Sequence, residues 1–321
     1  MGWPWTVETP RLPARLPDGS AWPRITIVTP SRNQGAFIEE AIRSVLLQGY
    51  PDLEYIVSDG GSADGTVDII KKYAPWLAGW VSERDRGQSH AINKGFAAST
   101  GMLLGWLNSD DALLPGALSS VASLDLDFRD PLLIAGRSEY RNETGRARIW
   151  AVDAVPESRA QTFRYFSGLY FAQPSVLFTR SALGASGALD EALHYAMDLD
   201  LWLRMTKLAR IVTVERRLSW MRRHDDAKTW RDPLPVFDEV ERVLRAHVSD
   251  DVRGIVEEEL EAARARRAAA WIDAGRGSLR DGSRAGALAA AVQAVRAELS
   301  AAFSRRWLGL VLRALAPARF T

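Results

Sequence analysis

An apolar run in the first half of the chain ends directly in an acidic turn sequence. The run from Met102 to Leu107 is typical of a buried strand, and residues 108–111 after it read Asn-Ser-Asp-Asp. Carboxylate oxygens are hard ligands that suit Mg²⁺ or Mn²⁺, ions that share their coordination with water and substrate phosphates. An Asx turn before the next helix would use the same aspartates. This tetrapeptide alone therefore leaves a metal site and a structural turn as alternatives.

A second aspartate lies at the end of an earlier strand. Asp59 belongs to the predicted strand Leu53–Gly61, where its carboxylate could accept from a nucleobase imide or a ribose hydroxyl. Gly60 and Gly61 would let such a ligand approach the backbone. The alternative is a turn before a helix that begins near Thr66. The first strand is not followed by G-x-G-x-x-G, so we do not expect a dinucleotide cofactor.

Two further segments place charge near predicted helix starts. Asp85 and Arg86 lie in a loop leading into a helix, where they could reach a nucleotide and its diphosphate; a solvated loop with a surface ion pair is the alternative. Asp198 and Asp200 begin the predicted helix 197–209. Two residues apart, they cannot share a helix face, so one can act as a general base while the other caps or pairs elsewhere. The helix dipole would also favour both aspartates without any chemistry.

A histidine follows two arginines late in the chain. Two extended segments are predicted at 211–214 and 218–224, and Arg222, Arg223 and His224 close the second. A single histidine is more often structural than a ligand. Beside a divalent ion and two guanidinium groups, however, it would ligate the ion or contact a diphosphate.

The elements around these residues predict an α/β fold. Apolar strands at 25–30, 53–61 and 102–107 alternate with helices, which favours an open, mostly parallel central sheet flanked by helices. Ligands of such sheets bind beyond the carboxyl ends of the strands. Ser31, Asp59 and Asp110 each follow a strand end, so we expect them to gather at one rim.

The composition limits the class of protein. A chain of 321 residues has room for one large domain and an appendage, and its net charge of +1 gives no field that would favour nucleic acid. The sequence has no cysteine, which excludes disulfides and thiolate sites and is typical of a reducing, cytoplasmic setting. No apolar run approaches the ~20 residues that span a bilayer.

Three parts are expected along the chain. We expect an extended N-terminal arm at residues 1–23, a domain that carries the candidate catalytic residues at 24–235, and an all-helical C-terminal region at 236–321. Near the end, residues 304–320 mix leucines with arginines. They predict either a short amphipathic helix lying on an anionic membrane surface or a last helix packed on its domain. The oligomeric state stays open.

Four stretches of the sequence together resemble the family 2 glycosyltransferases. They are VTPSRNQGAFIEEAIRSVLLQGYPDLEYIVSDGGSADGT, LGWLNSDD, QPSVLF and HYAMDLDLWLRM, and the resemblance covers about residues 24 to 230. It implies the A-type glycosyltransferase fold and an inverting transfer from a nucleotide-diphosphate sugar, UDP-type, with Mn²⁺ or Mg²⁺ as cofactor. It also implies a saccharide or lipid-linked acceptor in cell-surface polysaccharide biosynthesis, in the cytoplasm or at the inner face of the membrane.

The resemblance also implies roles for individual residues. Asp110 would be the principal metal ligand of the family's D-x-D motif, and His224 would contact the metal or the diphosphate. Asn108 replaces the first aspartate of that motif but still offers a carbonyl oxygen. Asp198 would be the catalytic base, with Met197 where the family has glutamate. The residues expected to contact the donor are Pro30, Ser31, Asp59, Asp85, Arg86, Asn108, Ser109, Arg222 and Arg223.

Two other functions are weighed against this one. A sugar-phosphate nucleotidyltransferase also uses a parallel sheet and paired carboxylates, but the glycine-rich loop with Arg and Lys that it needs is not found in TPSRNQGAF. A non-catalytic carbohydrate- or partner-binding relative is the third reading, for which Asn108 and Met197 leave room.

Overall fold

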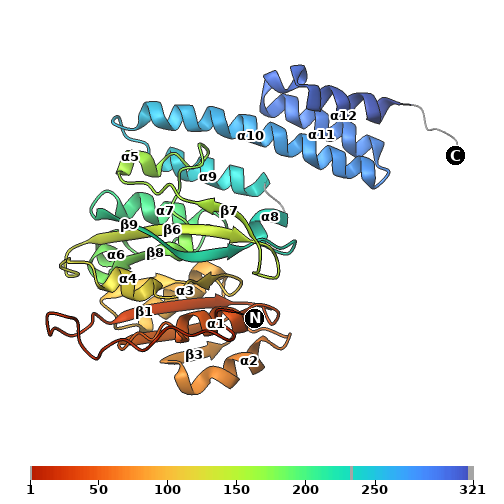
Figure 1. Cartoon of the computed structure of the whole chain (residues 1–321). Helices are drawn as coiled ribbons and strands as arrows, with labels where there is room; N and C mark the ends of the chain where they lie inside the picture. The colour runs from red at the N-terminus through yellow and green to blue at the C-terminus, as the bar shows by residue number, and fades with distance from the viewer. Residues whose placement is uncertain (1, 232–233, 317–321) are drawn as a thin grey trace. The chain divides into compact units, whose positions relative to one another are not determined.

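The computed structural model describes residues 2–231 and 234–316, which form two compact units. The sheet unit contains the described residues of Met1–Thr162 and Leu169–Trp230, and the helical unit those of Phe163–Gly168 and Arg231–Thr321 (Figure 1). The helical unit thus begins at Arg231, whereas the sequence predicts its start at residue 236, and it includes a six-residue segment from the middle of the predicted catalytic domain. In the arm expected at residues 1–23, the described residues 2–23 form no helix or strand.

Nine strands of the described residues form one sheet in the order β3-β2-β1-β4-β8-β6-β9-β5, with β7 paired to β6. Strands β1 to β4 are parallel, and β8 is antiparallel to both β4 and β6, which returns β6 and its parallel neighbour β9 to the direction of β1. Only β5, β7 and β8 run the other way, so the predicted, mostly parallel sheet is confirmed. The strands are β1 Ile25–Ser31, β2 Leu53–Asp59, β3 Gly79–Ser82, β4 Leu103–Trp106, β5 Ala112–Leu113, β6 Leu132–Arg141, β7 Arg148–Val152, β8 Val176–Thr179 and β9 Arg210–Arg222.

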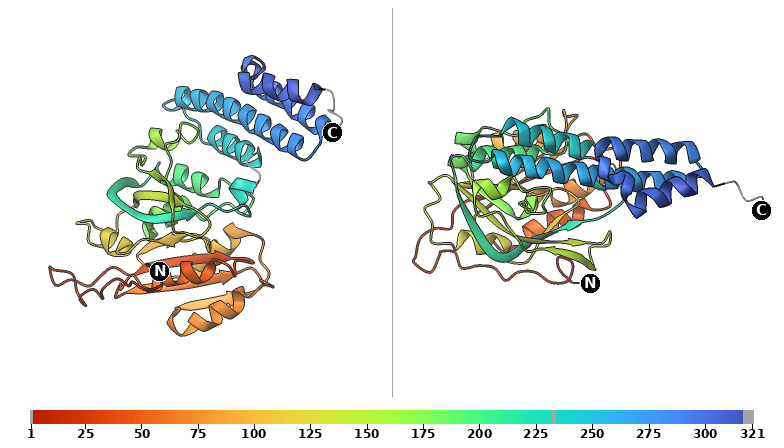
Figure 2. Two further views of the ribbon diagram at one scale, coloured as in Figure 1. Left: turned by 45° about the vertical axis from the view of Figure 1, so that its right-hand side comes forward. Right: turned by 90° about the horizontal axis from the view of Figure 1, so that it is seen from above.

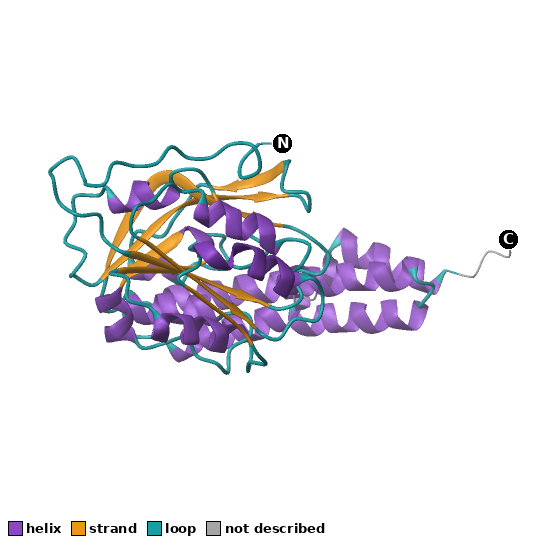
Figure 3. Cartoon of the chain, turned by 90° about the horizontal axis from the view of Figure 1, so that it is seen from below, coloured by secondary structure: helices purple, strands orange, loops and turns teal. Residues whose placement is uncertain are grey.

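Helices flank this sheet, as Figure 3 shows in purple against the orange strands. They are α1 Ile38–Leu46, α2 Thr66–Tyr73, η1 Ala74–Trp76, α3 Gln88–Ala98, α4 Ala117–Ala122, α5 Arg159–Thr162, η2 Gln173–Ser175, α6 Arg180–Ser186, α7 Met197–Met205 and α8 Lys228–Arg231. Strand β1 is buried at all seven positions, Thr26 and Thr29 included, which explains why its sequence has no charged residue. On one face Ile38 and Ile42 of α1 pack in the same core cluster as Ile25 and Ile27.

A glycine lets α3 approach the sheet closely. A Cβ atom at Gly95 would lie 2.5 Å from Cγ1 of Val28, so a larger residue would push the helix away from β1. The close packing of α3 fixes the position of its first turn, which begins at Gln88.

Strand β9 is one long strand where the sequence predicts two extended segments, 211–214 and 218–224. Its pairing with β6 shifts register between Gly136, opposite Val214, and Arg137, opposite Arg217. The two residues between, Glu215 and Arg216, have no partner in that register, so the pairing contains a bulge. The bulge breaks the alternating pattern and hides the continuity of the strand in the sequence.

The helical unit confirms the expected all-helical C-terminal region. It contains α9 Leu234–Ala246, α10 Arg253–Arg280, α11 Arg284–Ala297, η3 Leu299–Phe303 and α12 Arg305–Leu315. Figure 2 shows α10 and α11 side by side. Buried residues of α10, α11, η3 and α12 form a separate small core. Among the described residues, no helix is both long and apolar enough to cross a membrane.

A buried carboxylate holds segment 163–168 in the helical unit. Glu259 of α10 is fully buried, and its Oε2 accepts hydrogen bonds from the backbone N–H groups of Phe166 (2.6 Å) and Ser167 (3.0 Å). The Ser167 hydroxyl donates to the other oxygen. A buried charge is tolerated when hydrogen bonds surround it, and here they fix the segment.

Candidate active site

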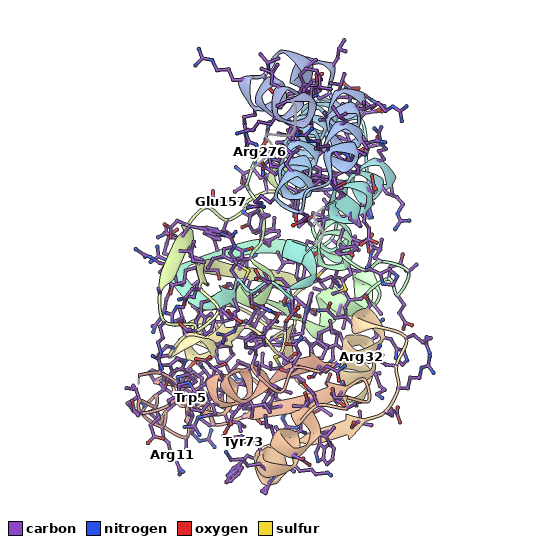
Figure 4. All side chains as sticks on the ribbon, turned by 90° about the vertical axis from the view of Figure 1, so that its right-hand side faces the viewer. Trp5, Arg11, Arg32, Tyr73, Glu157 and Arg276 are labelled. Atoms are coloured by element: carbon purple, nitrogen blue, oxygen red, sulfur yellow. The ribbon has the colours of Figure 1, made fainter. Side chains whose placement is uncertain are left out.

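The carboxyl ends of β1, β2 and β3 lie in register at one rim of the sheet. Ser31 pairs with Asp59 across β1 and β2, and Asp59 pairs with Ser82 across β2 and β3. Figure 4 labels Arg32, which follows Ser31 directly and marks this end of β1. Strand β4 runs parallel to β1, so the sequence after Trp106 enters the same rim. The predicted polar clusters therefore follow strand ends on one edge.

The Asp59 carboxylate is buried and organises the loop that follows β2. Its Oδ2 accepts from the Ser82 hydroxyl (2.6 Å) and from the backbone N–H groups of Ser62 (2.9 Å) and Gly61 (3.1 Å). Its Oδ1 accepts from the Ser62 hydroxyl. Three of the four donors reach Oδ2, so Oδ1 retains a lone pair that could accept from a ligand. Asp59 thus stabilises the turn, and its contact with a ligand stays a prediction.

Two other donor candidates lie next to this loop. The Ser31 hydroxyl is buried without a hydrogen-bond partner among the described residues, while its backbone carbonyl accepts from Gly60 (2.8 Å). The neighbouring Pro30 is buried and pairs with Ser58. Asp85 lies against the same loop, because a Cβ atom at Gly60 would come within 2.7 Å of its Oδ2. A buried hydroxyl without a hydrogen-bond partner is costly, so the predicted contact of Ser31 with a ligand is compatible with its environment.

Arg86 follows Asp85 directly, and its side chain forms an ion pair. Its guanidinium is largely exposed and makes two hydrogen bonds to Glu191, of 3.0 and 2.7 Å. Such a surface ion pair is the alternative, expected from the sequence, to a contact between Arg86 and a diphosphate.

The two residues predicted to hold a cation lie together. Oδ2 of Asp110 is 3.2 Å from Nε2 of His224, although 114 positions separate them in the sequence. The His224 side chain is only 2% exposed and packs on Phe37, with ring centroids 4.6 Å apart, whereas the Asp110 side chain is 23% exposed. The described residues contain no group of three or more metal-ligating side chains. A pair is nevertheless compatible with Mg²⁺ or Mn²⁺, which take one or two protein ligands alongside substrate phosphates.

Asp111 fastens the acidic turn to the end of β9. Its Oδ1 accepts from the Arg222 backbone N–H (3.0 Å), and its Oδ2 faces Nδ2 of Asn108 at 3.4 Å. Burial, and then the negative charge of Asp110, raise the pKa of the Asp111 carboxyl well above its ordinary value. The Asp111 side chain is thus enclosed in the turn, whereas the Asp110 side chain is partly exposed to solvent. Ser109 between them is also buried.

The side chain of Arg222, which we expected to contact the donor, binds to other parts of the protein. Its guanidinium is buried, with Nη2 2.6 Å from Oε2 of Glu40 and Nε 2.9 Å from the Asp110 carbonyl oxygen. Nη1 donates to the Glu143 carbonyl. The guanidinium carbon lies 4.6 Å from the ring centroid of Trp220, so a cation–π contact adds to these bonds. All three guanidinium nitrogens bind within the protein, and the side chain holds the backbone of Asp110 in place.

The amide of Asn108 is likewise engaged. Its Oδ1 accepts from Nε2 of Gln88 (2.8 Å), and Oε1 of Gln88 accepts in turn from Lys228 (3.1 Å). The carbonyl oxygen that we expected to face a ligand therefore joins the acidic turn to the first turn of α3. Together with Asp111, these side chains form a hydrogen-bonded chain from α8 to β9.

Asp198 is the second residue of α7 and is half-buried, with its Oδ1 accepting from the backbone N–H of Leu199. The preceding Met197 accepts a hydrogen bond from the Ser89 hydroxyl at its sulfur (2.9 Å). Because Ser89 follows Gln88, the first turns of α7 and α3 are neighbours. Asp200 instead pairs with Arg204 of its own helix at 2.7 Å. Of the two aspartates, Asp198 remains the candidate base.

Sequence reasoning missed four residues of this site, namely Phe37, Glu40, Gln88 and Lys228. Gln88 lies just after the charged segment that contains Asp85 and Arg86, and Lys228 follows His224 closely. Phe37 and Glu40 belong to the start of α1, where an acidic first turn is ordinary. The remaining candidate, Arg223, is exposed, with its guanidinium carbon 6.0 Å from the Trp150 ring centroid.

A mixed, curled sheet with helices on its faces and an acidic turn at its carboxyl-end rim defines an A-type glycosyltransferase fold. The family model described as Glycosyl transferase family 2 matches residues 26–187, half of the chain, and the chain belongs to this family. The protein is a glycosyltransferase.

Relatives and solved structures agree with this assignment. An uncharacterized glycosyltransferase of Rickettsia typhi is 26% identical over 228 residues, 68% of this chain and 70% of that protein. One of Mycobacterium tuberculosis is 28% identical over 228 residues, 70% of this chain and 84% of that protein.

Two solved structures share the fold. The mannosyltransferase PcManGT from Pyrobaculum calidifontis, in complex with GDP-Man and Mn²⁺, has a TM-score of 0.58 at 19% identity, covering 91% of this chain and 84% of that one. S. aureus TarS 1–349, in complex with UDP-GlcNAc, has a TM-score of 0.55 at 17% identity, covering 90% and 85%.

Proposed function

We propose that the protein transfers a sugar, with inversion, from a UDP-type nucleotide-diphosphate donor to a hydroxyl of a growing glycan or a lipid-linked saccharide. The observation that supports this most directly is the 3.2 Å approach of Asp110 and His224 at the rim that also holds Asp59. The solved relatives bind UDP-GlcNAc, or GDP-Man with Mn²⁺, which supports a nucleotide-sugar donor. We place the reaction in the cytoplasm, in the synthesis of cell-surface polysaccharide.

Asp110 and His224 are the residues that would hold a divalent cation. When bound, such a cation neutralises the charge that develops on the leaving nucleotide diphosphate. Ser31 and Asp59 would bind the nucleoside, since the Ser31 hydroxyl has no partner among the described residues and Oδ1 of Asp59 keeps a lone pair. Arg222 acts as a positioning residue, because its guanidinium is buried and holds the Asp110 carbonyl.

Asp198 is the proposed general base. As the acceptor hydroxyl attacks the anomeric carbon, its proton passes to the Asp198 carboxylate while the bond from that carbon to the diphosphate oxygen breaks on the opposite face. One displacement inverts the stereochemistry, through a transition state with oxocarbenium character. Asp200 cannot substitute, because it is paired with Arg204.

The test compares Asp198→Asn with the matched control Asp200→Asn. We expect Asp198→Asn to lose transfer by about 10²–10⁴-fold, the usual contribution of a general base. It should keep the thermal stabilisation given by UDP with Mn²⁺. Asp200→Asn should keep turnover per folded molecule. Near-normal turnover of Asp198→Asn would refute the base assignment.

A screen of nucleotide diphosphates, each with and without Mn²⁺, tests the donor class. Joint stabilisation by UDP and Mn²⁺ that is lost in Asp110→Asn and His224→Ala would support the proposed cation site. Release of pyrophosphate from a nucleoside triphosphate and a sugar phosphate would instead favour a nucleotidyltransferase. Failure of every nucleotide to bind would favour a non-catalytic relative.

A further inference from the structure

The helix α12 carries apolar side chains on two faces. On its inner face Leu310 and Ala314 are buried in the small core of the helical unit. On its outer face Leu308, Leu312 and Leu315 are 51%, 60% and 64% exposed. Their spacing of four and three residues places these three leucines along one stripe. We call them the leucine stripe.

Exposed apolar side chains concentrate in this part of the described chain. Of the thirteen large apolar side chains that are exposed there, five lie within residues 292–315. By contrast, the exposed positions of α10 include Glu257, Glu258, Glu261, Arg264 and Arg266. Isolated exposed leucines are ordinary on protein surfaces, but a row of them on one helix face marks an interaction surface.

The charged residues of the segment that carries the leucine stripe are all of one sign. Residues 299–321 contain four arginines and no aspartate or glutamate, although the whole chain carries a net charge of only +1. Arg306 pairs with Asp273, whereas Arg305, one turn before Leu308, and Arg313, between Leu312 and Leu315 in the sequence, are both exposed. Arg319 and Phe320, part of the predicted amphipathic segment, lie outside the described residues. The apolar stripe is therefore flanked by cationic groups.

We propose that the outer face of α12 docks the protein on a membrane surface that contains anionic lipid. The leucine stripe would enter the boundary between headgroups and acyl chains, and Arg305 and Arg313 would bind lipid phosphates. A second copy of the chain is a poorer occupant, because a symmetric contact through the stripe would bring like-charged arginines together. The proposal does not depend on the donor or on the catalytic base.

Flotation of the full-length protein with vesicles tests the proposal. We expect binding to vesicles of phosphatidylcholine with one quarter phosphatidylglycerol, and at least tenfold weaker binding to phosphatidylcholine alone. Leu308→Ser/Leu312→Ser/Leu315→Ser should bind at least tenfold more weakly. Arg305→Gln/Arg313→Gln should lose most of the preference for phosphatidylglycerol and most of the sensitivity to salt.

A matched control removes three exposed apolar side chains elsewhere. Ile149, Leu208 and Val248 are 42%, 59% and 38% exposed, and their joint replacement by serine should leave binding unchanged. Far-UV circular dichroism checks that the helices of each variant persist. The arginine variant keeps the test decisive if the leucine variant loses helix. Unchanged flotation of both variants overturns the proposal. The proposal is also overturned if the wild type sediments as a dimer and does not bind vesicles, and the leucine variant sediments as a monomer.

Discussion

The buried pair between Arg222 and Glu40 should stabilise the sheet unit and the acidic turn together. Replacing Arg222 by Met keeps an apolar stem of similar length against Trp220 but removes the guanidinium. Glu40 would then be left without its 2.6 Å partner, and the Asp110 and Glu143 carbonyls would each lose a donor. The substitution therefore creates an uncompensated, mostly buried charge.

Its cost follows from that geometry. Removing one partner of a buried ion pair destabilises a protein by about 3–5 kcal/mol, because the other charge stays desolvated. For a domain of this size each kcal/mol lowers the melting temperature by about 2–4 °C, so a decrease of roughly 6–20 °C is expected. Glu40→Gln in the Arg222→Met background removes the stranded charge and should recover part of the loss, with a coupling of about 1–3 kcal/mol.

Thermal unfolding followed by tryptophan fluorescence measures this effect. Ten of the twelve tryptophans belong to the sheet unit, so the signal reports mainly on that unit. Arg216→Met is the control, because Arg216 is exposed and donates only to the Pro115 carbonyl among the described residues. The control should change stability by no more than about 0.5 kcal/mol. A melting temperature of Arg222→Met within about 2 °C of the control, or additivity with Glu40→Gln, would refute the reasoning.

Three further substitutions test other parts of the structure. Asn108→Asp removes the amide donor that faces Asp111 and adds a carboxylate beside it, so stability should decrease by about 1–3 kcal/mol. That loss should grow as pH rises, because repulsion raises the pKa of the added carboxyl in the folded state; urea unfolding at about pH 5 and pH 8 measures both effects. Gly101→Ala would place a Cβ atom 2.7 Å from the Thr26 backbone nitrogen and should cost about 1–3 kcal/mol of unfolding free energy, whereas Gly2→Ala, with open space around it, should be neutral. Glu259→Ala leaves the buried backbone N–H of Phe166 and the partly buried one of Ser167 without their acceptor, and should speed proteolysis at segment 163–168, while Glu259→Gln, which keeps an acceptor, should do so less.

Much of the sheet unit could be predicted from local patterns. All seven positions of β1 are buried, so its apolar residues lie on both of its faces, whereas α1 places its apolar residues on one face. Strand β9 is predicted in two pieces, because its bulge interrupts the period that indicates a strand. The hexapeptide 163–168 joins the helical unit through Glu259, a contact between residues more than 90 positions apart that no local pattern indicates.

The sequence by itself determined which polar residues follow the strand ends, since parallel strands bring their carboxyl ends to one rim. The order of strands and helices is therefore enough to put Asp59 and Asp110 at that rim. Only the tertiary structure decided how those side chains are used. It put His224 beside Asp110, buried Arg222 against Glu40, and bound the Asn108 carbonyl to Gln88. Such pairings depend on the packing of elements distant in the chain, and residue type alone does not distinguish a guanidinium that binds a ligand from one that holds a loop.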